Sequence, residues 1–180
     1  MPKVSIILGS DSDWPIIEPG YLVLKEFGIG VDVLVASAHR TPRVVEEFAV
    51  SAREKGAEVL IAVAGAAAHL PGVVAAWTTL PVIGVPVAGH ALAGMDALFS
   101  ILQMPSGVPV GTMAIDGGKN AALYAISILA LKYEDLARRL LDFREAQARM
   151  VARKNEVLQA ELAAGDKTEA QKEKELQIER

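Results

Sequence analysis

The chain has 180 residues, of which 52% are hydrophobic and 22% charged, so we expect a folded protein rather than a disordered one. Its net charge of -4 argues against a nucleic-acid-binding protein, and no apolar run is long enough to span a membrane. The absence of cysteine excludes disulfides and thiolate zinc sites, and it fits a cytoplasmic location.

The first 131 residues alternate between strand-like and helix-like segments. Strands are expected at 3–8, 31–36, 58–64, 82–87 and 108–115, and helices after residue 13 and at 42–55, 92–102 and 121–131. This alternation predicts a five-stranded parallel sheet of flavodoxin-like order in a three-layer α/β/α sandwich.

Several local features refine this prediction. Pro15 fits the first turn of the first helix, whereas Pro19 and Gly20 predict a kink or break inside it. Thr41 is expected to cap the second helix, which Pro42 would begin.

The last 48 residues have a different composition. Apolar residues recur at steps of three, four and seven over 133–164, which predicts a long amphipathic helix that docks on a neighbouring subunit. Residues 165–180 are polar, and we expect this tail to fray or be disordered. The predicted organisation is therefore a catalytic domain over 1–132, the helix, and the tail.

Charge is unevenly distributed along the chain. Residues 1–131 hold 7 Lys and Arg and 11 Asp and Glu, whereas residues 132–180 hold 11 of each kind. Eighteen charges cover the surface of a 131-residue domain thinly, so part of that surface is expected to be buried in a homo-oligomer.

Three polar clusters follow the first three strands, where ligands bind in open parallel sheets. The first, residues 9–13, has the sequence GSDSD and offers hydroxyls and backbone N–H groups to an anion, although simple helix capping is the preferred explanation of this cluster taken alone. Its spacing matches neither a dinucleotide fingerprint nor a Walker loop, and Asp11 and Asp13 alone are a weak metal signal.

The second cluster is the more informative one. His39 can exchange a proton near neutral pH, and Arg40 beside it can bind a phosphate or carboxylate through two hydrogen bonds. An incidental pair on a surface loop is the alternative. In the third cluster, the small residues before His69 would let a ligand approach the backbone closely. His69 itself could instead be a helix-start residue that is hydrogen-bonded to a nearby carbonyl. His90 is interpreted as a structural or surface residue.

These clusters, in this order, resemble the 5-(carboxyamino)imidazole ribonucleotide mutase family. The stretches that carry the resemblance are GSDSDWP (9–15), SAHRTP (37–42), AAAHLPG (66–72), TTLPVIGVPV (78–87), LFSILQMPSGVPVGTMAI (98–115) and KNAALYAISILAL (119–131). The likeness covers roughly residues 4–131.

The resemblance implies an isomerase of purine biosynthesis that uses no metal and no cofactor. It would move a carboxylate from the exocyclic nitrogen to carbon 4 of an aminoimidazole ribonucleotide, by decarboxylation, retention of CO₂ and recarboxylation. It implies His39 as general acid and base. The implied substrate-binding residues are Ser10, Ser12, Asp13, Ser37, Arg40, Gly65, Ala67 and His69. The family commonly forms homo-octamers whose sites draw on more than one subunit, and no nucleic acid or membrane partner is implied.

The chain departs from the family pattern at a few positions. The family usually has glycine where Val63 and Ala66 stand, and a position that requires a positive φ would then be strained. The family often has serine in place of Gly89, and the turn at 116–118 is shorter than in many members.

Other functions fit the sequence less well. A related carboxylase branch uses CO₂ directly, but it tends to have lysine in place of Arg40 and lacks the AAAHLPG stretch. A non-catalytic flavodoxin-like binding module or a purely structural oligomer would leave His39 and Arg40 unexplained.

Overall fold

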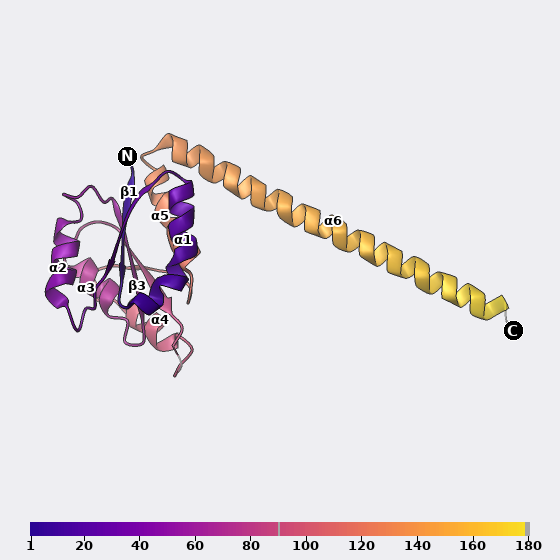
Figure 1. Ribbon diagram of the computed structural model, residues 1–180, viewed down its shortest axis with the longest axis horizontal. Coiled ribbons are helices and arrows are strands. Elements are labelled where there is room, and N and C mark those ends of the chain that lie inside the picture. The colour runs from indigo at the N-terminus through magenta and orange to yellow at the C-terminus, as the bar shows by residue number, and fades with distance from the viewer. Residues whose placement is uncertain (90, 179–180) are drawn as a thin grey trace. The chain divides into compact units, whose positions relative to one another are not determined.

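The computed structural model describes residues 1–89 and 91–178, with side chains through residue 163 (Figure 1). His90 therefore lies outside the described residues. The elements in chain order are β1 (Lys3–Leu8), a 3-10 turn (Asp11–Asp13), α1 (Trp14–Glu26), β2 (Gly30–Val35), α2 (Pro42–Ser51), β3 (Val59–Gly65), α3 (Leu70–Ala76), β4 (Val82–Val87), α4 (Met95–Leu102), β5 (Gly111–Thr112), α5 (Gly118–Ala130) and α6 (Glu134–Ile178).

The five strands form one parallel sheet in the order β2-β1-β3-β4-β5. This is the flavodoxin-like order expected from the sequence. Its register places the end of β1 beside the ends of both neighbours, because Leu8 pairs with Val35 and with Val63. The segments that leave β1, β2 and β3 therefore start at the same edge of the sheet.

Helices cover both faces of the sheet. Figure 1 shows α1 and α5 on one side of the strands and α2 and α3 on the other. The inner strands β1 and β3 are buried on both faces, as their uninterrupted apolar sequences require, and Ile6, Ile7 and Ile61 have no exposed surface. The three-layer prediction is confirmed.

The sequence predicts a kink or break at Pro19 and Gly20. A break is wrong, because α1 continues from Trp14 to Glu26 with Pro19 on its exposed side. Gly20 has a packing role instead. A Cβ atom there would lie 2.5 Å from the carbonyl oxygen of Gly118, and one on Gly118 would lie 2.0 Å from that of Ile16. The two glycines thus let the backbones of α1 and α5 approach more closely than any side chain would allow.

The fifth strand is much shorter than predicted. Only Gly111 and Thr112 pair with β4, whereas the sequence predicts a strand over 108–115. Pro109 lies before the paired residues and has no N–H to donate to a ladder, which shortens the strand. Beyond the strand, the N–H groups of Met113 and Asp116 still donate to the carbonyl oxygens of Gly84 and Pro86, each at 2.9 Å.

Two helices are shorter than expected, and one begins earlier. α2 ends at Ser51 rather than near residue 55, α4 begins at Met95 rather than at 92, and α5 begins at Gly118. Pro42 begins α2 and Thr41 occupies its N-cap position, as predicted, but the side chain of Thr41 makes no capping hydrogen bond, so that part of the prediction is wrong.

The chain divides into two units, Met1–Ala137 and Arg138–Arg180. The second unit belongs to α6, in which Glu145 and Arg149 form an ion pair of 3.5 Å one turn apart. The helix continues to Ile178, whereas the sequence predicts a polar tail from residue 165. Within the described residues, no helix is both long and apolar enough to cross a membrane.

Candidate functional site

A cavity of about 670 Å³ lies at the carboxyl ends of β1, β2, β3 and β4. This volume lies within the range typical of sites for small-molecule ligands. Eight of the nine site residues proposed from the sequence line it: Ser10, Ser12, Asp13, Ser37, His39, Arg40, Gly65 and His69. The ninth, Ala67, is exposed and does not line it.

The turn after β1 forms one side of the cavity. The hydroxyl of Ser10 accepts a hydrogen bond from the N–H of Ser12 at 3.3 Å, and the carboxylate of Asp13 accepts one from the N–H of Ser10 at 3.1 Å. Ser10 and Asp13 form a capping box, in which the side chain of each residue accepts from the backbone of the other, so the capping interpretation of this cluster is confirmed as local structure. The two serine hydroxyls are 2.8 Å apart and both line the cavity.

Asp13 is almost completely buried, with 6% of its surface exposed. Burial raises the pKa of its carboxyl group, the hydrogen bond from the Ser10 backbone opposes this rise, and the nearby charge of Asp11 adds to it. The carboxylate is thus fixed at the cavity wall rather than free in solvent.

The turn between β2 and α2 carries His39 and Arg40. The hydroxyl of Thr41 accepts a hydrogen bond from the N–H of Ser37 at 2.9 Å and lies 3.1 Å from its carbonyl oxygen. The hydroxyl of Ser37 accepts one from the N–H of Arg40 at 3.3 Å. Thr41 thus closes the turn rather than capping α2, and the closed turn holds the two candidate residues at the cavity.

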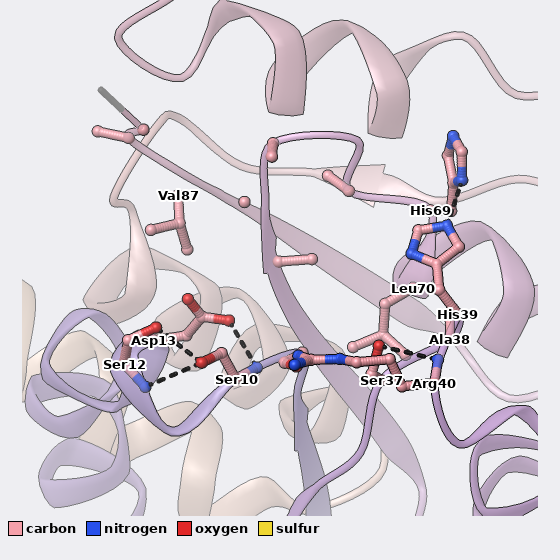
Figure 2. A pocket seen from close by; sticks show the side chains of 17 residues that line it. Ser10, Ser12, Asp13, Ser37, Ala38, His39, Arg40, His69, Leu70 and Val87 are labelled. Carbon is pink, nitrogen blue, oxygen red and sulfur yellow. Dashed lines mark hydrogen bonds between the residues drawn. The ribbon is translucent and has the colours of Figure 1, made fainter. Parts of the chain in front are cut away.

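Two histidines from different loops meet at this cavity. Nε2 of His39 lies 2.8 Å from Nδ1 of His69, and the rings are inclined by 72° to each other. His69 stands at the start of α3, as one interpretation of the sequence had it, but its ring contacts His39 rather than a carbonyl. Figure 2 shows the histidines on one side of the pocket and the Ser10 turn on the other.

Arg40 spans the space between these two sides. Its Nη2 atom lies 3.5 Å from the carbonyl oxygen of Gly9, so the guanidinium reaches the turn after β1 (Figure 2). The side chain is exposed and has no carboxylate partner in the ion pairs of the described residues. Its hydrogen-bond donors are therefore available to an anion beside the serine hydroxyls.

The third wall is the small-residue loop between β3 and α3. Ala64, Ala66 and Ala68 line the cavity together with Gly65. Ala66 and Ala68 have positive φ angles of 51° and 24°, a conformation that L-residues rarely adopt. Of the two positions where the resembled family usually has glycine, Val63 and Ala66, only Ala66 has a positive φ, so only there would glycine relieve strain.

Replacing Ala66 with glycine is expected to stabilise the fold by about 0.5–1 kcal/mol, because relief of left-handed strain exceeds the entropy that glycine adds to the unfolded chain. Denaturant unfolding would measure this change. Ala67→Gly is the matched control in the same loop, because the φ of Ala67 is not positive, and it should destabilise. Equal effects of the two changes would contradict the strain argument.

The fourth wall, formed by Val87 at the end of β4 and by Ala88 and Gly89 after it, was not among the site residues predicted from the sequence, although Gly89 was noted as a departure from the family. Valine, alanine and glycine carry no group that could donate, accept or move a proton through a side chain, so nothing in their chemistry marks them as site residues. The position of β4 next to β3 is the signal that could have identified them, because strand ends at one edge of a parallel sheet share a site. No group of three potential metal-binding side chains occurs among the residues whose placement is described.

Comparison with known proteins identifies close relatives. A sequence profile of the AIR carboxylase family matches residues 3–169. An N5-carboxyaminoimidazole ribonucleotide mutase from Thermotoga maritima is 52% identical over 159 residues, which cover 88% of this chain and 93% of that protein. One from Saccharolobus solfataricus is 51% identical over 164 residues, which cover 91% of this chain and all of that protein.

Solved structures agree with these sequence matches. A crystal structure of PurE from Treponema denticola superimposes with a TM-score of 0.75 at 30% sequence identity. The superposition covers 84% of this chain and 94% of that one.

Proposed function

Because the chain belongs to the AIR carboxylase family, we propose that it is an N5-carboxyaminoimidazole ribonucleotide mutase of purine biosynthesis. This enzyme is an isomerase that moves a carboxylate from the exocyclic nitrogen to carbon 4 of an aminoimidazole ribonucleotide. The observation that carries the proposal is the pairing of His39 with His69 beside Arg40 in one pocket.

His39 is the proton carrier in this mechanism. Two ring nitrogens 2.8 Å apart hold one proton between them, because one nitrogen must donate and the other accept. His39, as an imidazolium, protonates the exocyclic nitrogen as the bond from that nitrogen to the carboxylate breaks and CO₂ is released. Carbon 4 then attacks CO₂, and the neutral imidazole removes the proton that carbon 4 carried. The histidine returns to its starting state.

The remaining residues position the ribonucleotide. Arg40 and the hydroxyls of Ser10 and Ser12 would bind the phosphate, because the guanidinium already reaches the serine turn. The buried carboxylate of Asp13 would repel a phosphate, so it is assigned to the ribose hydroxyls. Ser37, Gly65 and His69 are assigned to the pocket lining, and the exposed position of Ala67 makes it the weakest assignment.

The alanine-lined wall gives the cavity a second property that the reaction needs. Ala64, Ala66 and Ala68 present methyl groups where CO₂ would rest between its release and its addition to carbon 4. An apolar surface there excludes water, which would otherwise hydrate CO₂ or allow it to escape.

Asp13→Asn is expected to raise thermal stability at pH 7 while it weakens substrate binding about tenfold. Burial raises the pKa of this carboxyl in the folded state, so its stabilising contribution is complete at acid pH and is lost as the pH rises through the folded pKa. The amide avoids this loss, and its advantage should shrink as the pH falls toward 3.8.

Thermal unfolding across this pH range and substrate titration at pH 7 would test both effects. Asp142→Asn is the matched control, because Asp142 is exposed on α6, lies outside the main cavity and does not contribute to the pKa of Asp13. A lower melting temperature for the Asp13 variant at pH 7 would contradict the burial argument.

A homo-octamer remains the expected assembly. Leu92, Met95, Phe99 and Leu102 are all exposed and recur at helical spacing in and just before α4, as an interface between subunits would require. The proposed docking of α6 on a neighbouring subunit would add to such an interface. Light scattering coupled to size exclusion would give the subunit number, and a monomer at micromolar concentration would contradict the proposal.

The activity itself is tested with two parallel reactions without ATP or metal. One contains N5-carboxyaminoimidazole ribonucleotide, and the other contains aminoimidazole ribonucleotide with bicarbonate. Rapid formation of the carbon-4 carboxylate in the first reaction alone would support the mutase. Formation in the second alone would place the chain in the carboxylase branch, and tight binding without turnover would favour a binding module.

A further inference from the structure

We propose that Asp116 is a positioning residue for the proposed reaction and that it holds the Val87–Gly89 wall of the pocket in place through a hydrogen bond to the backbone of Ala88. Asp116 does not line the cavity itself. The inference rests on the proposed function for its kinetic consequences, although the hydrogen bond can be tested independently of any activity.

Asp116 is bonded to both sides of Val87. Its N–H donates to the carbonyl oxygen of Pro86 at 2.9 Å, and its Oδ1 atom accepts from the N–H of Ala88, also at 2.9 Å. In a parallel ladder, one residue makes this same pair of bonds to the two residues that flank its partner, and it accepts through its backbone carbonyl. Here a side-chain carboxylate replaces that carbonyl.

The replacement follows from the direction that the chain takes after β5. Asp116 has a φ of 57°, and its own carbonyl oxygen accepts from the N–H of Gly118 in the turn that leads into α5. The backbone carbonyl is therefore turned away from β4. Ala88 and Asp116 are both exposed, so without the side chain the N–H of Ala88 would exchange a fixed acceptor for solvent at the point where β4 runs into the pocket.

The wall that Asp116 holds faces the candidate site. Val87, labelled in Figure 2, lies at the end of β4 in register with Gly65 of β3, and all three residues of the wall line the cavity. Gly94 supports the same segment from behind, because a Cβ there would lie 3.1 Å from the Cα of Ala88 and 2.7 Å from the side chain of Ile115. The backbone around Ala88 therefore has the cavity on one side and is contacted by residues 94 and 116 on the other.

Three substitutions of Asp116 distinguish the effect of its hydrogen bond to Ala88 from the effects of its strained backbone and of its charge. Asp116→Asn keeps an acceptor and tolerates a positive φ but removes the charge. Asp116→Gly accepts the same φ without strain but has no acceptor. Asp116→Ala has neither property. If Asp116 positions the wall, the glycine variant should remain stable and yet bind substrate poorly.

The kinetic expectation is a change in KM rather than in kcat, because the wall contributes to binding and not to proton transfer. For Asp116→Gly we expect KM to rise about tenfold and kcat to change by less than about threefold, whereas Asp116→Asn should stay within about twofold of the wild type in both. A wild-type KM in the glycine variant would overturn the proposal. An equal rise in the asparagine variant would also overturn it, because charge rather than the hydrogen bond would then matter.

Hydrogen exchange of the full-length protein gives a readout that needs no substrate. The amide of Ala88, followed in a peptide spanning residues 86–89, should exchange about tenfold faster in Asp116→Gly and near the wild-type rate in Asp116→Asn. Unchanged exchange in the glycine variant would overturn the inference. If the wild-type protein turned over neither substrate, the proposed function would fail while this exchange pattern still tested the role of Asp116.

Discussion

Replacing His39 with asparagine is expected to preserve the fold and substrate binding and to lower kcat by about 10²- to 10⁴-fold, the usual contribution of a positioned acid or base. His39 is exposed on the turn that Ser37 and Thr41 close through their own hydrogen bonds, so its loss leaves that turn intact. Circular dichroism, calorimetric titration with substrate and single-turnover kinetics would separate the three properties.

Two further variants make this test specific. Arg43→Asn introduces the same side chain on the exposed surface of α2, outside the cavity, and should behave like the wild type. His39→Gly removes the ring entirely, so imidazole added to the solution should restore part of the rate if proton transfer is what was lost. Wild-type turnover in the asparagine variant would refute the role of His39 as the proton carrier.

Replacing Gly118 with alanine is expected to lower the free energy of unfolding by about 3 kcal/mol or more, near the upper end for overpacking substitutions. The added Cβ would lie 2.0 Å from the carbonyl oxygen of Ile16, and the nearby Cα of Ile17 is only 2.9 Å away. These are backbone atoms of a helix and cannot rotate aside, so α1 and α5 must separate. Chemical denaturation followed by circular dichroism would measure the loss.

Gly89→Ala is the matched control for this prediction. It is the same change at a glycine whose φ is not positive and where an added Cβ meets no atom of the described residues within 4 Å, its chain neighbours aside. We expect it to alter the free energy of unfolding by less than about 0.5 kcal/mol. Similar losses for the two variants would show that the α1–α5 contact is looser than the structure indicates.

The sequence predicts the fold most accurately where an element depends on its own residues. The predicted strand 3–8 has the same first and last residues as β1. A parallel strand that is buried on both faces is recognisable from its own run of apolar residues, whatever strands pair with it. The errors concern contacts made over long distances. Judged from its sequence neighbours, Gly20 predicts a helix break. In the structure, glycine is required there because the backbone of Gly118, almost a hundred residues later, packs against it. Val110 was predicted to lie in a strand, but it lies just before the short strand β5 and packs against the core from an irregular segment.

The same distinction applies to the candidate site. The residues that carry recognisable chemistry, among them His39, Arg40 and Asp13, were identified because each follows a predicted strand. The clusters that carry His39 and His69 meet in one pocket, as their positions after strands of a parallel sheet predict. The direct contact between the two rings was not predicted, since no spacing rule connects side chains on loops thirty residues apart. Asp116 was noted only as part of a short turn, and its bond to Ala88 depends on a bend of the backbone that the sequence does not reveal.

The close contact between α1 and α5 also bears on how the chain folds during synthesis. β1 and α1 leave the ribosome first, but Gly118 follows Gly20 by 98 residues, which takes roughly 5–20 s at ordinary elongation rates. Until then, the face of β3 and β4 that α5 will cover lacks that helix. Nascent chains that pause before residue 118 should therefore be the species most prone to aggregate and to require a chaperone.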